Sequence, residues 1–270
     1  MGNRLSLLED VEKNSIQQVQ KLIKDGADVN QIVSYKGKPT TLLHIVASKG
    51  YEGIIKLLIS NGALIEAKNH KGSTALHVAA KNNQISIVKL LLDFGANVNA
   101  IDKFHVTPLH LATQNGNCQC IKMLLDYKAN VDPPFLRSDP PLRIAILNDK
   151  IDVMKILLNN GANPNRIKQS NWLDILIRIQ YSRQKYDILQ LLIAYGADLD
   201  SKDSTGSNCL HRAFVLGDKK LAKLLLRNGA CINIKDDEKG YNAIENSIQY
   251  NNFGFAKHIL YRLGTSRKPA

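Results

Sequence analysis

Apolar residues occur along this chain in pairs of short runs, and a glycine follows the second run of most pairs. The clearest pair lies in residues 69–101, with a first run from Ala75 to Ala80 and a second from Ile85 to Leu92. Runs of this length with apolar residues at helical spacing predict amphipathic helices. The pattern therefore predicts an inner and an outer helix, followed by a loop that starts at Gly95.

The same pattern returns 33 residues later, where Thr107-Pro108-Leu109-His110-Leu111-Ala112 precedes a second run from Ile121 to Leu125. A period of this length with a Thr-Pro-Leu-His-x-Ala signature resembles the ankyrin repeat. The resemblance implies an all-α solenoid of about eight helix–turn–helix repeats with short β-turn loops, in which each repeat contacts only its neighbours. It is strong in the second, third, fourth and seventh repeats and weaker in the fifth, sixth and eighth.

We expect one ankyrin-repeat domain over residues 1–264, with a short C-terminal tail at 265–270. Its outer two repeats are expected to act as caps, the first with a short inner helix from Leu5 to Glu12. The expected repeats span about residues 3–35, 36–68, 69–101, 102–134, 135–168, 169–202, 203–236 and 237–264.

Several repeats depart from the common pattern. The loop before the second repeat is about three residues too long, and the sixth repeat is four residues longer than the fifth. Four residues is about one helical turn, so we expect a longer inner helix or an enlarged turn around residues 181–183. Lys128 stands where other repeats have a glycine after the outer helix, and His105 replaces the loop glycine. Positive φ angles are expected at both.

Of the 270 residues, 44% are hydrophobic, and the chain has a net charge of +12 and a pI near 9.5. This charge favours acidic partners: a protein with an acidic surface, an anionic membrane surface or, as the disfavoured case, nucleic acid. The cysteines are scattered and we find no secretory signal, so reduced thiols and a cytoplasmic location are expected, with the nucleus as an open alternative. No apolar run approaches the ~20 residues needed to cross a bilayer.

The residues most suggestive of chemistry have structural explanations. His44, His77, His110 and His211 recur with the repeats, so they form a row instead of converging on a metal. The resemblance implies that they bond between neighbouring turns. Cys118 and Cys120 stand at apolar positions of an outer helix, where cysteine acts as a small hydrophobe.

We find no glycine-rich phosphate loop, nucleophile elbow or carboxylate–histidine constellation. We therefore expect no catalytic, cofactor or metal site, and ankyrin repeats rarely catalyse. Lysines occupy equivalent positions on successive outer helices, which indicates either a basic row for an acidic surface or a solvated outer position. They are Lys56, Lys89, Lys122, Lys155 and Lys223, with Gln20 and Gln190 completing the row.

The residues expected to contact a partner are those that break the repeat pattern with aromatic, apolar or arginine side chains, because such residues are enriched at binding hot spots. An alternative is that Phe135 and Trp172 fold inward. The expected partner-binding residues are Phe104, Phe135, Leu136, Trp172, Tyr181 and Arg183.

The N-terminus begins Met1-Gly2-Asn3-Arg4-Leu5-Ser6, which matches the N-myristoylation pattern at Gly2. We therefore weigh three functions. The first is a monomeric intracellular adaptor or scaffold that grips a protein through its concave surface of loop tips and inner helices. The second is the same adaptor anchored to a membrane by a myristoyl chain. The third is a regulator or inhibitor of a signalling or ubiquitin-ligase complex. A ubiquitin-ligase adaptor needs a C-terminal box, and residues 265–270 are too short to hold one.

Overall fold

The computed structural model describes residues 2–134, 138–166, 175–176, 179–250, 254–255 and 257, with the backbone alone at residues 2–6. The chain divides into two compact units, which we call the N-terminal block, Met1–Ala162, and the C-terminal block, Asn163–Ala270. Each block is built from helical hairpins, so each is described by itself.

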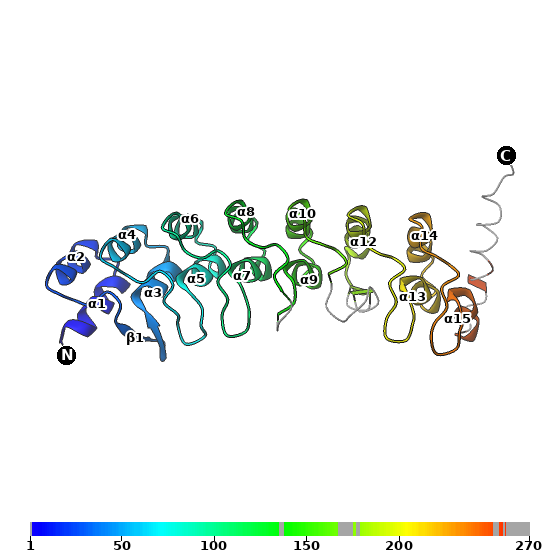
Figure 1. Cartoon of the computed structure of the whole chain (residues 1–270), viewed down its shortest axis with the longest axis horizontal. Coiled ribbons are helices and arrows are strands. Elements are labelled where there is room, and N and C mark those ends of the chain that lie inside the picture. The colour runs from blue at the N-terminus through cyan, green and yellow to red at the C-terminus, as the bar shows by residue number, and fades with distance from the viewer. Residues whose placement is uncertain are drawn as a thin grey trace. The chain divides into compact units, whose positions relative to one another are not determined.

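In the N-terminal block, every hairpin pairs one inner with one outer helix. The inner helices form one row and the outer helices another, while the loops extend on the side of the inner row (Figure 1). The pairs are α1 Gly2–Glu12 with α2 Ile16–Lys24, α3 Leu42–Lys49 with α4 Glu52–Ser60, α5 Ala75–Lys81 with α6 Ile85–Asp93, α7 Pro108–Asn115 with α8 Cys118–Asp126, and α9 Pro141–Leu147 with α10 Ile151–Asn159.

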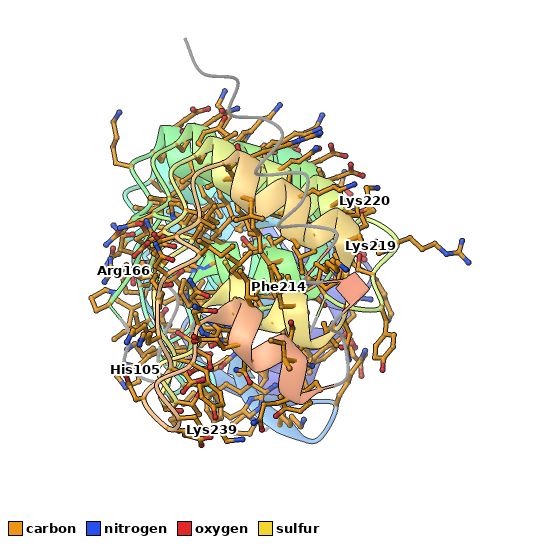
Figure 2. The ribbon with its side chains drawn as sticks, turned by 90° about the vertical axis from the view of Figure 1, so that its right-hand side faces the viewer. His105, Arg166, Phe214, Lys219, Lys220 and Lys239 are labelled. Atoms are coloured by element: carbon orange, nitrogen blue, oxygen red, sulfur yellow. The ribbon has the colours of Figure 1, made fainter. Side chains whose placement is uncertain are left out.

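The described residues of the C-terminal block follow the same plan. Ile175 and Leu176 are helical and buried, and the labelled helices are α12 Lys185–Ala194, α13 Cys209–Val215, α14 Lys219–Arg227 and α15 Ala243–Gln249. Phe214 of α13 is fully buried and packs against Phe255, with ring centroids 5.0 Å apart. Figure 2 shows Phe214 inside the block.

Stacking between neighbouring hairpins buries the apolar faces. Inner helix α5 packs against α3 on one side and α7 on the other, and outer helix α6 packs against α8. Leu76, Ile87 and Leu91 of the third repeat are at most 1% exposed. Full burial of one such side chain contributes about 1.5–3 kcal/mol. The mostly helical hairpin stacks confirm the predicted all-α repeat solenoid.

The long loop before the second repeat forms a β-hairpin, which the sequence analysis did not foresee. Strands β1, Ile32–Tyr35, and β2, Lys38–Thr41, pair antiparallel with Tyr35 opposite Lys38. The two residues between them, Lys36 and Gly37, have φ angles of +51° and +74°. Positive φ at both positions is what a type I′ turn requires. The additional residues therefore project a short, twisted ribbon from the loop side.

The backbone predictions at the repeat ends are confirmed. Every predicted glycine after an outer helix has a positive φ, and Lys128 and His105 take the same conformation with φ of +65° and +59°. The predicted start of the first helix was wrong, because α1 begins at Gly2 and not at Leu5. In the sixth repeat, residues 179–184 form turn and irregular backbone before α12, while residues 167–174 and 177–178 lie outside the described residues. The single-domain extent and the repeat boundaries stay predictions.

Candidate binding surface

A histidine in each regular repeat fixes the loop of the next repeat. The backbone N–H of Thr74 donates to Nδ1 of His77 at 3.2 Å, so the ring proton resides on Nε2. This Nε2 donates to the carbonyl oxygen of Val106 in the following loop, at 3.0 Å. His44 makes the equivalent link to Ser73, and His211 to Tyr241. The predicted role in bonding between neighbouring turns is confirmed.

Three buried histidines of the N-terminal block, His44, His77 and His110, are neutral at physiological pH. Burial lowers the pKa of His44 and His77 below 6.5, although the hydrogen bonds to Ser73 and Val106 partly offset this effect. Burial also lowers the pKa of His110, to about 4. The histidines therefore hold the loops in place without adding positive charge, and the charge of the loop surface comes from other residues.

The loops of the N-terminal block are rich in lysine. Lys36, Lys38, Lys68, Lys71 and Lys103 are all exposed. The acids of the same loops bond the loop backbone: an Asp102 oxygen accepts from the N–H groups of Phe104 and Val106 at 2.8 and 3.0 Å, and a Glu66 oxygen accepts from Asn97 at 2.8 Å. Lys68 and Lys103 also bond backbone carbonyls, those of Ile101 and His70, so Lys36, Lys38 and Lys71 are the lysines that this surface offers to a partner.

A pocket of about 290 Å³ opens between the β1–β2 hairpin and the inner helices α3 and α5; we call it the hairpin pocket. The hairpin contributes an aromatic ring and two lysines, the helices an apolar floor, and the loop between α4 and α5 a histidine. These residues are Tyr35, Lys36, Lys38, Ile45, Val78 and His70. Ligand pockets combine an apolar lining with a few polar groups in this way.

The loops of the C-terminal block are acidic instead. Residues 198–203 include three aspartates and residues 236–238 are Asp-Asp-Glu. A second pocket of about 260 Å³ lies among them, lined by Asp203, Asp236 and Glu238 together with Arg212 and Lys239. Lys239 lies on the loop side of this block, whereas Lys219 and Lys220 lie at the start of α14 (Figure 2).

The residues predicted to contact a partner belong to different blocks. Phe104 is 58% exposed in the loop between α6 and α7 of the N-terminal block. Tyr181, 89% exposed, and the exposed Arg183 lie in the turn before α12 of the C-terminal block. Phe135, Leu136 and Trp172 lie outside the described residues.

A buried charge cluster anchors the turn that carries Tyr181 and Arg183. Lys185, at the start of α12, is 8% exposed and pairs with Asp218 at 2.7 Å. The hydroxyl of Tyr186 donates to Asp218, and Lys220 lies 3.9 Å from the centre of the Tyr186 ring. Burial and the bond to Asp218 raise the pKa of Tyr186 to about 12. This cluster connects two repeats, which explains it without a ligand.

The remaining candidates among the described residues are the lysines of the outer helices and two cysteines. Lys56, Lys89 and Lys122 are exposed on the outer helices and form no ion pair with a described residue. Cys120 is buried, which raises the pKa of its thiol to about 12, whereas Cys118 is half-buried. Among the described ranges, no three His, Cys, Asp or Glu side chains gather to hold a metal ion. None of the helices in these ranges is long and apolar enough to span a bilayer.

The sequence analysis missed the hairpin pocket. Two signals pointed to it: the three additional residues before the second repeat and a Lys-Gly pair between β-branched positions. The residues that the sequence analysis did not single out are Tyr35, Lys36, Lys38 and His70.

Comparisons with known proteins agree with the fold. A family model described as ankyrin repeats in three copies matches residues 7–102, 94–168 and 177–267. The chain is also 40% identical over 62 residues to the ADP-ribosylation factor GTPase-activating protein AGD4 of Arabidopsis thaliana. That match covers 23% of this chain and 8% of the relative, so the chain spans a small fraction of the relative's length.

Proposed function

Because the chain belongs to the ankyrin-repeat family, whose repeats are protein-interaction modules, we propose that it is a non-catalytic intracellular adaptor or scaffold. The proposed binding surface consists of the loops and inner helices of the N-terminal block. Its partner is a protein with an acidic surface, and the chain acts as a monomer. The GTPase-activating activity in the name of the Arabidopsis relative is not proposed for this chain, because the match covers 8% of that protein.

The observation that carries this proposal is the composition of the N-terminal loops. Phe104 is an exposed aromatic side chain on a loop whose backbone is fixed by Asp102 and by the link from His77 to Val106. The exposed Lys103 precedes it, and the backbone N–H of Lys103 bonds to the carbonyl of the exposed Lys71 in the neighbouring loop. Aromatic anchors on rigid supports are the side chains that dominate binding energy at protein interfaces. Positive charge around the anchor accelerates association with an acidic partner.

A second function is favoured by one specific feature, the Met1-Gly2 start with Ser6 in the transferase pattern. In this version the adaptor is attached to an anionic membrane by a myristoyl chain on Gly2. Attachment would change the location of the adaptor without changing the loops that bind its partner.

Two exposed phenylalanines of the N-terminal block provide a matched test. Phe104 lies in a loop, and Phe94, which is 47% exposed, ends the outer helix α6. We expect Phe104→Ser to lose most of the protein that the wild-type chain captures from its native lysate, because the loop loses its anchor. Phe94→Ser should capture as much as the wild type. Mass spectrometry identifies the captured protein, and circular dichroism melts verify that both variants are folded.

The comparison of the two variants decides the outcome. If Phe104→Ser retains the captured protein, the binding surface does not include this loop. If both variants lose it equally, the loss reflects a general reduction in exposed apolar surface, and the proposal fails as well.

A further inference from the structure

The hairpin pocket contains a histidine with a fixed backbone and an unbonded ring. The N–H of His70 donates to the carbonyl of Pro39 in β2 at 3.3 Å, and its carbonyl accepts from Nζ of Lys103 at 2.9 Å. Both ring nitrogens are shielded from solvent, yet neither has a hydrogen-bond partner among the described residues. Shielded polar groups of proteins almost always have a partner. A rotation of the His70 side chain that exposes one ring nitrogen to the pocket would therefore give this nitrogen a partner in a bound group.

Two other polar side chains that line the pocket already bond within the fold. His44 bonds through both ring nitrogens, to Thr41 and to the Ser73 carbonyl. The side-chain oxygen of Asn69 accepts from the backbone N–H groups of Lys71 and Ser73. These bonds hold the loop and the helix together, so the ring nitrogens of His44 and the oxygen of Asn69 are already used within the fold.

Two lysines at the mouth of the pocket have no anionic partner. Lys36 lies in the hairpin turn and Lys38 follows it; both are exposed, and neither forms an ion pair with a described residue. Nζ of Lys36 lies 5.5 Å from the centre of the Tyr35 ring, a cation–π contact that favours one orientation. The lining residues include no aspartate or glutamate, and Ile45 and Val78 provide an apolar floor.

We propose that the hairpin pocket binds an acidic side chain from an extended segment of the partner protein. The His70 side chain turns toward the pocket, where its ring donates a hydrogen bond to the carboxylate, and the carboxylate also pairs with Lys36 and Lys38. An apolar side chain next to the acidic one packs against Tyr35 and the pocket floor. This inference rests on the proposed function, because it names the segment of the partner that the adaptor recognises.

A peptide fits these observations better than a nucleic acid does. Nucleic-acid affinity comes from many phosphate contacts spread along a backbone. Here the available donors converge on one pocket with an apolar floor, which suits a single carboxylate beside an apolar side chain. A charged acceptor also strengthens a hydrogen bond from a shielded donor.

The test measures binding of short dye-labelled peptides to the full-length chain by fluorescence anisotropy. The probe is Gly-Glu-Leu-Glu-Glu-Gly, and the same peptide with glutamine for glutamate is its uncharged counterpart. We expect the glutamate peptide to bind and the glutamine peptide to bind about ten-fold more weakly, because hydrogen bonds to charged groups are the stronger ones. The imidazole NMR signals of His70 should shift when the glutamate peptide is added.

Matched variants separate the pocket from the overall charge. Lys36→Glu with Lys38→Glu should weaken binding of the glutamate peptide by about ten-fold or more, since two charge-assisted contacts are lost. Lys56→Glu with Lys89→Glu makes the same change of charge on the outer helices and should leave binding nearly unchanged. His70→Phe keeps the ring shape without a donor and should also weaken binding. Its melting temperature should match the wild type, because no bond to the ring is lost.

Three results would overturn the proposal. The first is equal binding of the two peptides, and the second is equal weakening by the two pairs of lysine variants, which would indicate diffuse attraction. The third is full displacement of the peptide by inorganic phosphate or a DNA duplex, which would indicate a general anion site. If any of these occurs while Phe104→Ser still loses the captured protein, the proposed function stands without the pocket.

Discussion

The two blocks build their loops on the same frame and place different charges on them. In the N-terminal block, His77 bonds to the carbonyl of Val106 in the next loop at 3.0 Å, and in the C-terminal block His211 bonds to that of Tyr241 at 3.1 Å. The helix-capping residue is a threonine in the first case and Asn208 in the second, and each bonds to the ring of its histidine. Acids outnumber lysines in the described loops 195–208 and 228–242 of the C-terminal block, whereas the described loops of the N-terminal block carry as many lysines as acids.

This difference shows that the frame does not determine the loop chemistry. The capping residue, the histidine and the glycine at the end of the outer helix fix the path of the backbone. Some loop charges bond the loop itself, as Asp102 does, whereas Lys36, Lys38 and Lys71 are exposed and can change at little cost to folding. Function in such a protein is therefore argued from the loops of each block, and the repeat fold alone does not identify it.

The largest expected effect tests whether the cores are equivalent. Leu91 on α6 and Leu225 on α14 are at most 1% exposed. We expect Leu91→Ala and Leu225→Ala each to cost about 2–5 kcal/mol, because each leaves a cavity in a stacked core. Urea denaturation followed by circular dichroism measures the loss. A much smaller loss for either leucine would show that the two blocks do not share one mode of stabilisation.

The frame could be predicted from the sequence because its signals recur. Each repeat presents the same spacing of apolar residues, so a helix pair that is uncertain in one repeat is supported by the next. The positive φ angles of Lys128 and His105 followed from their alignment with glycines, and the structure confirms both. The first helix started earlier than predicted, because its first residues lack an equivalent in a neighbouring repeat.

The hairpin pocket could not be predicted in the same way, because nothing in it repeats. The three additional residues before the second repeat indicated a longer loop, but not the pairing of Tyr35 with Lys38. The unbonded ring of His70 depends on the hydrogen bonds that its backbone makes to Pro39 and Lys103. Such contacts between successive loops are a property of the folded chain. A single-sequence pattern therefore located the loops and left their chemistry open.

A smaller effect concerns acid, because three linking histidines with lowered pKa values lie in the N-terminal block. Burial lowers the pKa of His110 to about 4 from 6.5, although the nearby charge of Asp102 raises it in part. Between these values the unfolded chain binds a proton that the folded chain does not. The contribution of neutral His110 to the free energy of unfolding is therefore complete above pH 6.5. It is lost as the pH drops toward 4, by up to about 3 kcal/mol.

Hydrogen exchange at a series of pH values measures this loss in each block. Amide protection in the N-terminal block should fall more steeply between pH 6.5 and about 4 than protection in the C-terminal block. His110→Gln should be less stable at neutral pH and should show a shallower pH dependence, because the titrating group is gone. An unchanged slope in this variant would rule out His110 as a source of the acid sensitivity.

The smallest expected effect concerns Gly2. It tests whether the lysines of the N-terminal loops also contact a membrane. One myristoyl chain binds a bilayer only marginally, with a constant of about 10⁴ M⁻¹, so a second signal is required. Each lysine near an anionic leaflet adds about 1 kcal/mol. The protein co-expressed with N-myristoyltransferase should gain the mass of a myristoyl group and sediment with anionic liposomes in a salt-sensitive way, and Gly2→Ala should abolish both effects.

In the acylated protein, Lys36→Glu with Lys38→Glu should reduce sedimentation with the liposomes. Lys235→Glu with Lys239→Glu in the acidic loops should have less effect, because neighbouring acids already offset those lysines. Equal reductions would remove the distinction between the two blocks at a membrane, and an unmodified Gly2 in protein from its native cell would end the anchoring hypothesis.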